Sequence, residues 1–192
     1  MTSEIRQGTQ TTISSDRRVA VLESALGTFA RFGYRKTSME AVAQAARISR
    51  PGLYFLFASK EDLFRAAVAR ALEEDINEVE RILGRSNLPI RDRLLDAFGQ
   101  WAGRYVGPVT REIAALIDEN PDLLGELVEA LPRRFAELVT SAIAAGAKEP
   151  DKKIAAPLAQ TMISTSIGIK YQVSSRAEYL QRLALAIDLL LR

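Results

Sequence analysis

Apolar residues recur along this chain at the three- and four-residue spacing of helices, with no run at the two-residue alternation typical of strands. The first such pattern places four apolar residues on one helix face: Val19, Leu22, Leu26 and Phe29. Gly33 follows where a helix commonly ends, so the pattern predicts a helix from just after Asp16 to Phe32. Residues 1–13 are polar and aperiodic, and we expect them to form a disordered arm.

The same spacing predicts further helices at about residues 38–45, 50–56, 60–83, 90–104, 109–119, 122–146, 151–172 and 176–191. Pro132 is expected to kink or break the helix that contains it. The helix that begins at Lys60 is too long for a small N-terminal unit alone, and we expect it to bridge two domains. The predicted fold is all-α, with about nine helices.

Three helix starts follow one another closely after the first helix. Thr37 and Glu40 have the spacing of a capping box, in which the Thr37 hydroxyl caps the first amides and Glu40 reaches back. Ser49 is placed to cap a second helix with Pro51 in its first turn, and Ser59 starts a third. Only about three residues remain for a turn between the first two, which is typical of a helix-turn-helix motif.

The composition narrows the chemistry that the chain can perform. Neither Cys nor His occurs among the 192 residues, which excludes disulfides, thiolate or imidazole metal sites and a Ser-His-Asp triad. Residues 1–70 carry a net charge of +5 and the remainder a net charge of −3. A basic N-terminal third favours a nucleic-acid module. We predict no catalytic residue, no metal site and no cofactor.

No stretch of the sequence approaches the roughly 18 consecutive apolar residues of a membrane span. The N-terminus also lacks the apolar segment of a signal peptide. We therefore expect a cytoplasmic protein with no membrane partner.

Four short motifs together resemble the tetracycline-repressor (TetR) family of bacterial transcription regulators. They are FARFGY at 29–34, TSMEAVA at 37–43, SRPGLY at 49–54 and FASKEDL at 57–63. The resemblance covers about residues 14–74, which it identifies as a three-helix helix-turn-helix DNA-binding domain. Residues 75–192 match the family only in their helix pattern and would form a larger C-terminal domain for effector binding and dimerisation. The resemblance implies a homodimeric repressor that a small molecule releases from a palindromic operator in double-stranded DNA.

The predicted second helix of the motif should enter the major groove. Arg50 at its start is suited to a bidentate bond with a guanine edge, the alternative being a phosphate or solvent role. Tyr54 is a candidate phosphate ligand, which the resemblance supports, or else a half-buried core residue. Phe55 would either lie against a thymine methyl group or simply pack. Lys60, at the start of the bridging helix, is a candidate phosphate contact.

The full set of predicted DNA-contact residues lies within 25 positions of one another: Lys36, Thr37, Ser38, Arg47, Ser49, Arg50, Pro51, Gly52, Tyr54, Phe55 and Lys60. For the cations the alternative is a solvated surface role. The family commonly has Gly where this chain has Arg47, often a small polar residue at Gly52 and often His at Leu56. If Arg47 is left-handed, it costs on the order of 1 kcal/mol relative to Gly.

The C-terminal domain offers two further candidate sites. An effector, expected to be apolar or aromatic, would bind among aromatic and flexible apolar side chains. The alternative role of these side chains is to form the core of the domain. The candidate residues are Phe98, Trp101, Tyr105, Phe135 and Met162. The last two helices are apolar on more than one side, which indicates contact with both the domain core and a second subunit. The candidate interface residues, whose alternative is again core, are Ile163, Ile167, Leu183, Ile187 and Leu190.

Two other classes of protein compete with a regulator. An enzyme would need acidic pairs such as Asp118 and Glu119 to act without His or Cys, and these pairs are more typical of solvated helix faces. A helical binding protein with a non-functional DNA module would not prefer a palindrome over random DNA.

Overall fold

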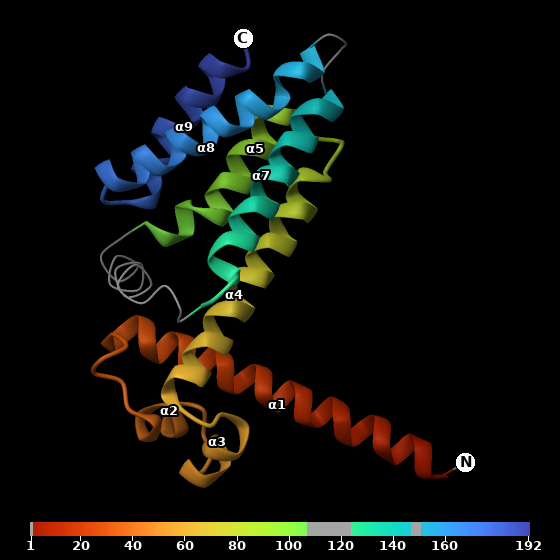
Figure 1. The fold of residues 1–192 in the computed structure, drawn as a ribbon, viewed down its shortest axis with the longest axis vertical. Coiled ribbons are helices and arrows are strands. Elements are labelled where there is room, and N and C mark those ends of the chain that lie inside the picture. The colour runs from red at the N-terminus through yellow and green to blue at the C-terminus, as the bar shows by residue number, and fades with distance from the viewer. Residues whose placement is uncertain (1, 107–123, 147–150) are drawn as a thin grey trace. The chain divides into compact units, whose positions relative to one another are not determined.

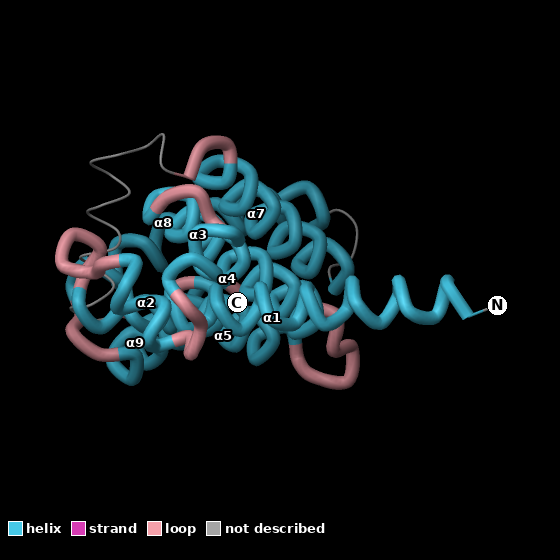
Figure 2. Tube along the Cα trace, turned by 90° about the horizontal axis from the view of Figure 1, so that it is seen from below, coloured by secondary structure: helices cyan, strands magenta, loops and turns pink. Residues whose placement is uncertain are grey.

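The computed structural model describes residues 2–106, 124–146 and 151–192, and every regular element among them is helical (Figures 1 and 2). The predicted all-α fold is confirmed for this part of the chain. The helix predicted at about 109–119 lies outside the described residues. No described helix is long and apolar enough to cross a membrane.

The helices group into two compact units, with the boundary inside α4 (Lys60–Leu83), between Arg70 and Ala71. The sequence placed the boundary after residue 74, in the same helix. The first unit holds three helices and the start of α4, and Leu124 groups with it: α1 (Thr2–Phe32), α2 (Met39–Ala45) and α3 (Arg50–Leu56). The second holds the rest of α4 and six further elements: α5 (Ile90–Trp101), η1 (Gly103–Tyr105), α7 (Leu127–Gly146), η3 (Asp151–Ile154), α8 (Ala155–Gln172) and α9 (Arg176–Leu190).

In the first unit α1 packs on α2, and α2 packs on α3. Phe29 of α1 meets Phe64 of α4 edge to face, with ring centroids 5.1 Å apart, and Tyr34 closes the cluster 4.9 Å from Phe64. Val42 of α2 and Leu53 of α3 are buried in the same unit. These apolar residues hold the short helices, which would be marginal alone in water.

The start of α1 differs from the prediction. Residues 2–13, expected to form a disordered arm, are the first turns of α1. No Pro interrupts this stretch, and extending a helix that already exists adds one hydrogen bond for each residue fixed. Apolar periodicity begins only at Val19, and it therefore predicted a shorter helix than the one observed.

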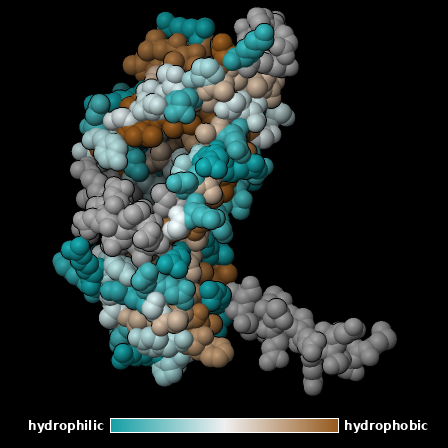
Figure 3. All heavy atoms as spheres, viewed as in Figure 1, coloured by the Kyte–Doolittle hydropathy of each residue, from teal (hydrophilic) through white to brown (hydrophobic). Residues whose placement is uncertain are grey.

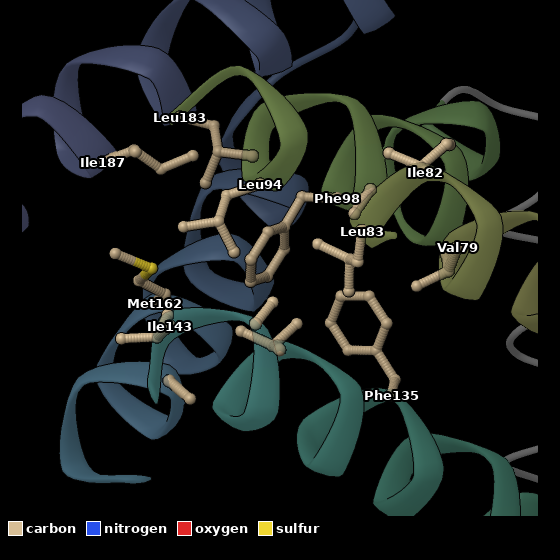
Figure 4. Close-up of a cluster of buried hydrophobic side chains, with 14 of the residues drawn as sticks. Val79, Ile82, Leu83, Leu94, Phe98, Phe135, Ile143, Met162, Leu183 and Ile187 are labelled. Atoms are coloured by element: carbon tan, nitrogen blue, oxygen red, sulfur yellow. The ribbon is translucent and has the colours of Figure 1, made fainter. Parts of the chain in front are cut away.

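In the second unit α5 and α7 pack together, and α8 and α9 cover them, with α9 also against α5. Phe98 of α5 and Phe135 of α7 meet edge to face at 5.0 Å between centroids. Figure 4 shows Leu94, Met162 and Leu183 directed into the same cluster from α5, α8 and α9.

Two glycines allow α9 to approach this core closely. A Cβ atom at Gly99 would lie 3.0 Å from Leu180 Cδ2, and one at Gly103 would lie 3.0 Å from the Tyr179 ring. Tyr179 is itself fully buried, and its hydroxyl is hydrogen-bonded to Ser166 Oγ of α8 at 2.7 Å. Larger side chains at either glycine would push α9 away from α5 and η1.

α7 continues through Pro132 as one helix, so of the predicted kink or break the break does not occur, and the helix begins at Leu127 rather than at about 122. A proline inside a helix costs about 3 kcal/mol through a lost hydrogen bond and a clash. The apolar residues that follow on one face, including Phe135, Val139 and Ile143, are buried and offset that cost.

Candidate nucleic-acid interface

The cap of α2 lies one residue later than the sequence indicated. Ser38, not Thr37, is the N-cap, because its side chain accepts a hydrogen bond from Ala41 N at 3.1 Å. The Thr37 side chain is buried and donates to Gly33 O at 2.8 Å. The prediction that Thr37 contacts DNA is therefore wrong for its hydroxyl, which is already bonded inside the unit.

Arg47 forms the turn between α2 and α3 in the left-handed conformation, with φ of 54°. Arg47 N donates to Gln44 O at 3.1 Å, and Ile48 N donates to Ala43 O at 3.0 Å. These two bonds satisfy the last carbonyls of α2 in the arrangement usually completed by glycine. Arg47 therefore carries the conformational cost of a left-handed residue other than glycine, and its exposed side chain projects from the turn.

Ser49 caps α3 as predicted, accepting a hydrogen bond from Gly52 N at 3.1 Å, with Pro51 in the first turn. A Cβ atom at Gly52 would lie 3.1 Å from Ser49 Oγ, a close approach that favours glycine there. The local sequence therefore sets where α3 begins.

Burial separates α3 into an inner and an outer side. Leu53 and the following Phe57 are buried. Arg50 is exposed, Tyr54 is 43% exposed and Phe55 is 88% exposed. The Arg50 guanidinium lies over the Tyr54 ring, 5.7 Å from its centroid. Side chains of types that can contact the bases or the phosphates of DNA thus share the outer side of one helix.

Arg18 of α1 holds the other end of α3, a role that the sequence did not reveal. One guanidinium nitrogen donates to Leu56 O at 3.0 Å, and the group lies over the Phe57 ring at 4.3 Å from the centroid. A cation that bonds a terminal carbonyl of a helix is favourable because the last carbonyls lack partners. No sequence signal links these residues, which are 38 positions apart.

Lys60 has a structural role that also went unpredicted. Its ammonium donates to Tyr34 O at 3.1 Å and Thr37 O at 3.2 Å, and it lies 4.5 Å from the centroid of the Tyr34 ring. The side chain therefore ties the start of α4 to the α1–α2 turn. Its contact with a phosphate stays a prediction.

Among the other candidates, Lys36 is exposed in the turn before α2, next to the exposed Arg35, and the exposed Ser38 caps that helix. Lys36, Arg35 and Arg47 are thus exposed cations at the helix-turn-helix of the first unit. The structure thus brings exposed cations and the outer side of α3 into one compact unit.

The effector candidates form part of the core of the second unit. Trp101 stacks on Phe135 at 5.3 Å between centroids, and Phe98 meets the same Phe135 ring edge to face. Phe98, Phe135 and Met162 are buried, whereas Trp101 and Tyr105 are half-buried. Only the last two therefore present surface that an effector can touch without moving the core.

Asp75 of α4 is a buried carboxylate next to these residues, and no sequence pattern indicated its burial. It accepts hydrogen bonds from Gln100 Nε2 at 2.9 Å, from the Arg104 guanidinium and from the Tyr105 hydroxyl. Burial raises the pKa of Asp75 above its ordinary value, and its three donors oppose that rise. The network joins α4 to α5 and η1.

The dimer candidates separate into two groups. Leu183 and Ile187 are fully buried in the core of their own unit (Figure 4), so naming them as interface residues is wrong. Ile163 and Leu190 are partly buried against the same core, and Ile167 is exposed. Large exposed apolar side chains that the sequence did not single out as interface residues are Tyr171 of α8 and Leu185 and Leu189 of α9.

A helix-turn-helix whose second helix is exposed and carries a cationic side chain is typical of DNA-binding transcription regulators. The sequence model described as "Bacterial regulatory proteins, tetR family" matches residues 21–67. The HTH-type transcriptional regulator YhgD of Bacillus subtilis is 28% identical over 141 residues, which are 71% of this chain and 72% of YhgD. The nicotine-responsive transcriptional repressor HdnoR of Paenarthrobacter nicotinovorans is 25% identical over 147 residues, 73% of this chain and 74% of HdnoR.

The fold agrees with these matches. A crystal structure of a TetR-family transcriptional regulator from Mesorhizobium loti superposes with a TM-score of 0.70 and 19% identity, covering 93% of this chain and 96% of that one. The match of residues 21–67, the HTH-type relatives and the shared fold together support a DNA-binding transcription regulator of the TetR type. The relatives regulate transcription, and the prediction that the chain is not an enzyme is confirmed by them.

Proposed function

We propose that the protein is a homodimeric repressor that a small molecule releases from a palindromic operator. The observation that carries the proposal is the outer side of α3, where Arg50, Tyr54 and Phe55 are exposed together. A two-fold dimer would present two such helices to half-sites about 34–36 Å apart, or a multiple of that. The similarity to HdnoR, a nicotine-responsive repressor, supports both repression and a small-molecule effector.

Arg50 is the proposed base-reading cation of this site. Its planar guanidinium matches the two acceptors of a guanine edge, while Lys36, Arg47 and Tyr54 would position the protein on phosphates. We place the DNA-binding domain at 14–74 and the effector and dimerisation domain at 75–192. A regulator of this kind would act in the cytoplasm, where bacterial DNA lies.

The helix α4 is the proposed route between effector and DNA. In the first unit its Lys60 is bonded to the carbonyls of Tyr34 and Thr37, and in the second its Asp75 is bonded to α5 and η1. An effector that binds better when α4 is displaced would shift the population away from the DNA-binding state. The single Trp101 near Asp75's partners would report such binding by its fluorescence.

The test is binding of the full chain to a duplex selected from a random library, measured by fluorescence anisotropy over a range of salt concentrations. We expect strong preference for a palindrome over random DNA. Arg50→Ala should remove about 1–3 kcal/mol of that preference while retaining binding to random DNA. Equal loss of affinity on both duplexes would show that Arg50 does not read bases.

A further inference from the structure

Pro51 and Phe55 form an apolar strip on α3 that is not used in the packing of the residues that the structure describes. They are four residues apart and therefore lie on the same face of the helix. Pro51 is exposed and Phe55 is 88% exposed, whereas Leu53 and Phe57 supply the buried contacts of this region. The core therefore does not explain why the chain places a phenylalanine at position 55.

Beside this strip lies a polar one. Arg50 and Tyr54 are also four residues apart, with the guanidinium 5.7 Å from the centroid of the tyrosine ring. The outer side of α3 thus carries a cationic strip next to an apolar strip. The cationic strip suits a base edge with hydrogen-bond acceptors, and the apolar strip suits a base edge with an apolar group.

The major-groove edges of the bases are polar with one exception, the C5-methyl group of thymine. A guanidinium finds two acceptors on guanine, but a phenyl ring has no hydrogen bond to offer any base. Its favourable contact in the groove is apolar, and the thymine methyl group is the apolar partner available there. A ring that faced only polar edges would desolvate them without compensation.

We infer that Phe55 is a specificity-determining residue that selects thymine in the operator half-site by contact with its 5-methyl group. This inference rests on the proposed function, because it requires α3 to enter the major groove. It assigns the apolar strip to thymine, while Arg50 reads guanine in the same half-site.

The size of the effect follows from the apolar group that is removed from water. Burying one methyl-sized group is worth about 0.8 kcal/mol, which corresponds to about fourfold in the dissociation constant. Replacing one thymine by uracil deletes only that methyl group and leaves the pairing edge of the base intact.

The experiment uses the full chain and the palindromic duplex selected with it. Each thymine of one half-site is replaced in turn by uracil, and the dissociation constant is measured at one salt concentration. For the wild type, at least one replacement should weaken binding about fourfold. Phe55→Ala should bind the thymine and uracil forms of that duplex equally, and Phe55→Leu, which keeps an apolar side chain, should still distinguish them.

Phe32→Ala is the matched control, since Phe32 is a 50% exposed phenylalanine of α1 in the same unit. This variant should keep the wild-type response to uracil. The inference is overturned if no uracil replacement weakens wild-type binding, or if Phe55→Ala keeps the full discrimination. Selection of no sequence at all by the wild type would instead overturn the proposed function, and the inference with it.

Discussion

At the scale of single residues, the first unit depends on bonds between side chains and carbonyls that lie far apart in the sequence. Lys60 reaches Tyr34 and Thr37, which precede it by 26 and 23 positions, and Arg18 reaches Leu56 across 38. Each of these cations satisfies a main-chain carbonyl at the end of a helix or in a turn. Their loss would loosen the unit without removing any apolar contact of the core.

Lys60→Met should destabilise the protein by about 1–3 kcal/mol, because hydrogen bonds from a charged donor to two carbonyls are lost while the aliphatic stem is kept. Chemical denaturation measures this change. Lys36→Met, which removes an exposed charge from the same unit, is the control and should stay within about 0.5 kcal/mol of wild type. Equal stability of Lys60→Met and wild type would contradict the structural role.

Tyr179 gives the second unit a pH dependence at high pH. Burial raises the pKa of Tyr179 to about 12, against an ordinary value of 10.0. Between these values the unfolded chain releases the phenol proton while the folded chain keeps it, so stability is fully present below pH 10 and falls as the pH rises towards 12.

Tyr179→Phe removes this contribution, and its unfolding free energy should fall less steeply than that of wild type between pH 10 and pH 12. Denaturant titrations at several pH values measure the two slopes. Tyr171→Phe, at an exposed position of α8, should keep the wild-type slope. If Tyr179→Phe also keeps that slope, the buried phenol is not the cause.

At the scale of elements, the helix-turn-helix is built mainly from local signals. Ser38 and Ser49 cap their helices, and Ser59 Oγ accepts from Asp62 N at 3.0 Å at the start of α4. These caps are readable in the sequence because each bond spans only three residues. The cap of α2 was nevertheless predicted one residue too early, since Thr37 and Ser38 are both able to cap and burial of Thr37 decided between them.

Arg47→Gly should stabilise the protein by up to about 1 kcal/mol, because a left-handed residue with a side chain is strained and glycine is not. The larger entropy of glycine in the unfolded chain reduces the gain. Thermal unfolding measures the effect, and Arg47→Ala, which keeps the strain while removing the charge, is the control. A lower melting temperature for Arg47→Gly than for Arg47→Ala would contradict this account of the turn.

At the scale of the whole molecule, charge and exposed apolar surface are distributed unevenly between the two units. The first 70 residues carry the positive net charge, in agreement with a DNA-binding helix-turn-helix in the first unit. In the second unit α9 is apolar on two sides: Tyr179, Leu183 and Ile187 face the core, and Leu185 and Leu189 are exposed. Brown patches over α8 and α9 in Figure 3 show apolar side chains gathered on that part of the surface.

The dimer prediction is therefore revised to the exposed side of α9. Leu185→Glu combined with Leu189→Glu should change the sedimenting species from a dimer to a single chain of 21.2 kDa, because the charges would have to be buried at the interface. Phe32→Glu, at an exposed apolar position of the first unit, is the control and should remain dimeric. A wild type that sediments as a single chain would contradict the proposed dimer itself.

The sequence by itself determined the all-α fold, the positions of α3 and α4 and the candidate reading surface on α3. These features depend on caps, turns and periodicity within a few residues, which are local and therefore readable. Only the tertiary structure decided which side of an apolar helix is buried, so that Leu183 belongs to the core and Leu185 to the surface. It likewise decided that Asp75 is buried and that Lys60 bonds carbonyls, since such contacts join segments 23 or more positions apart and leave no periodic trace in the chain.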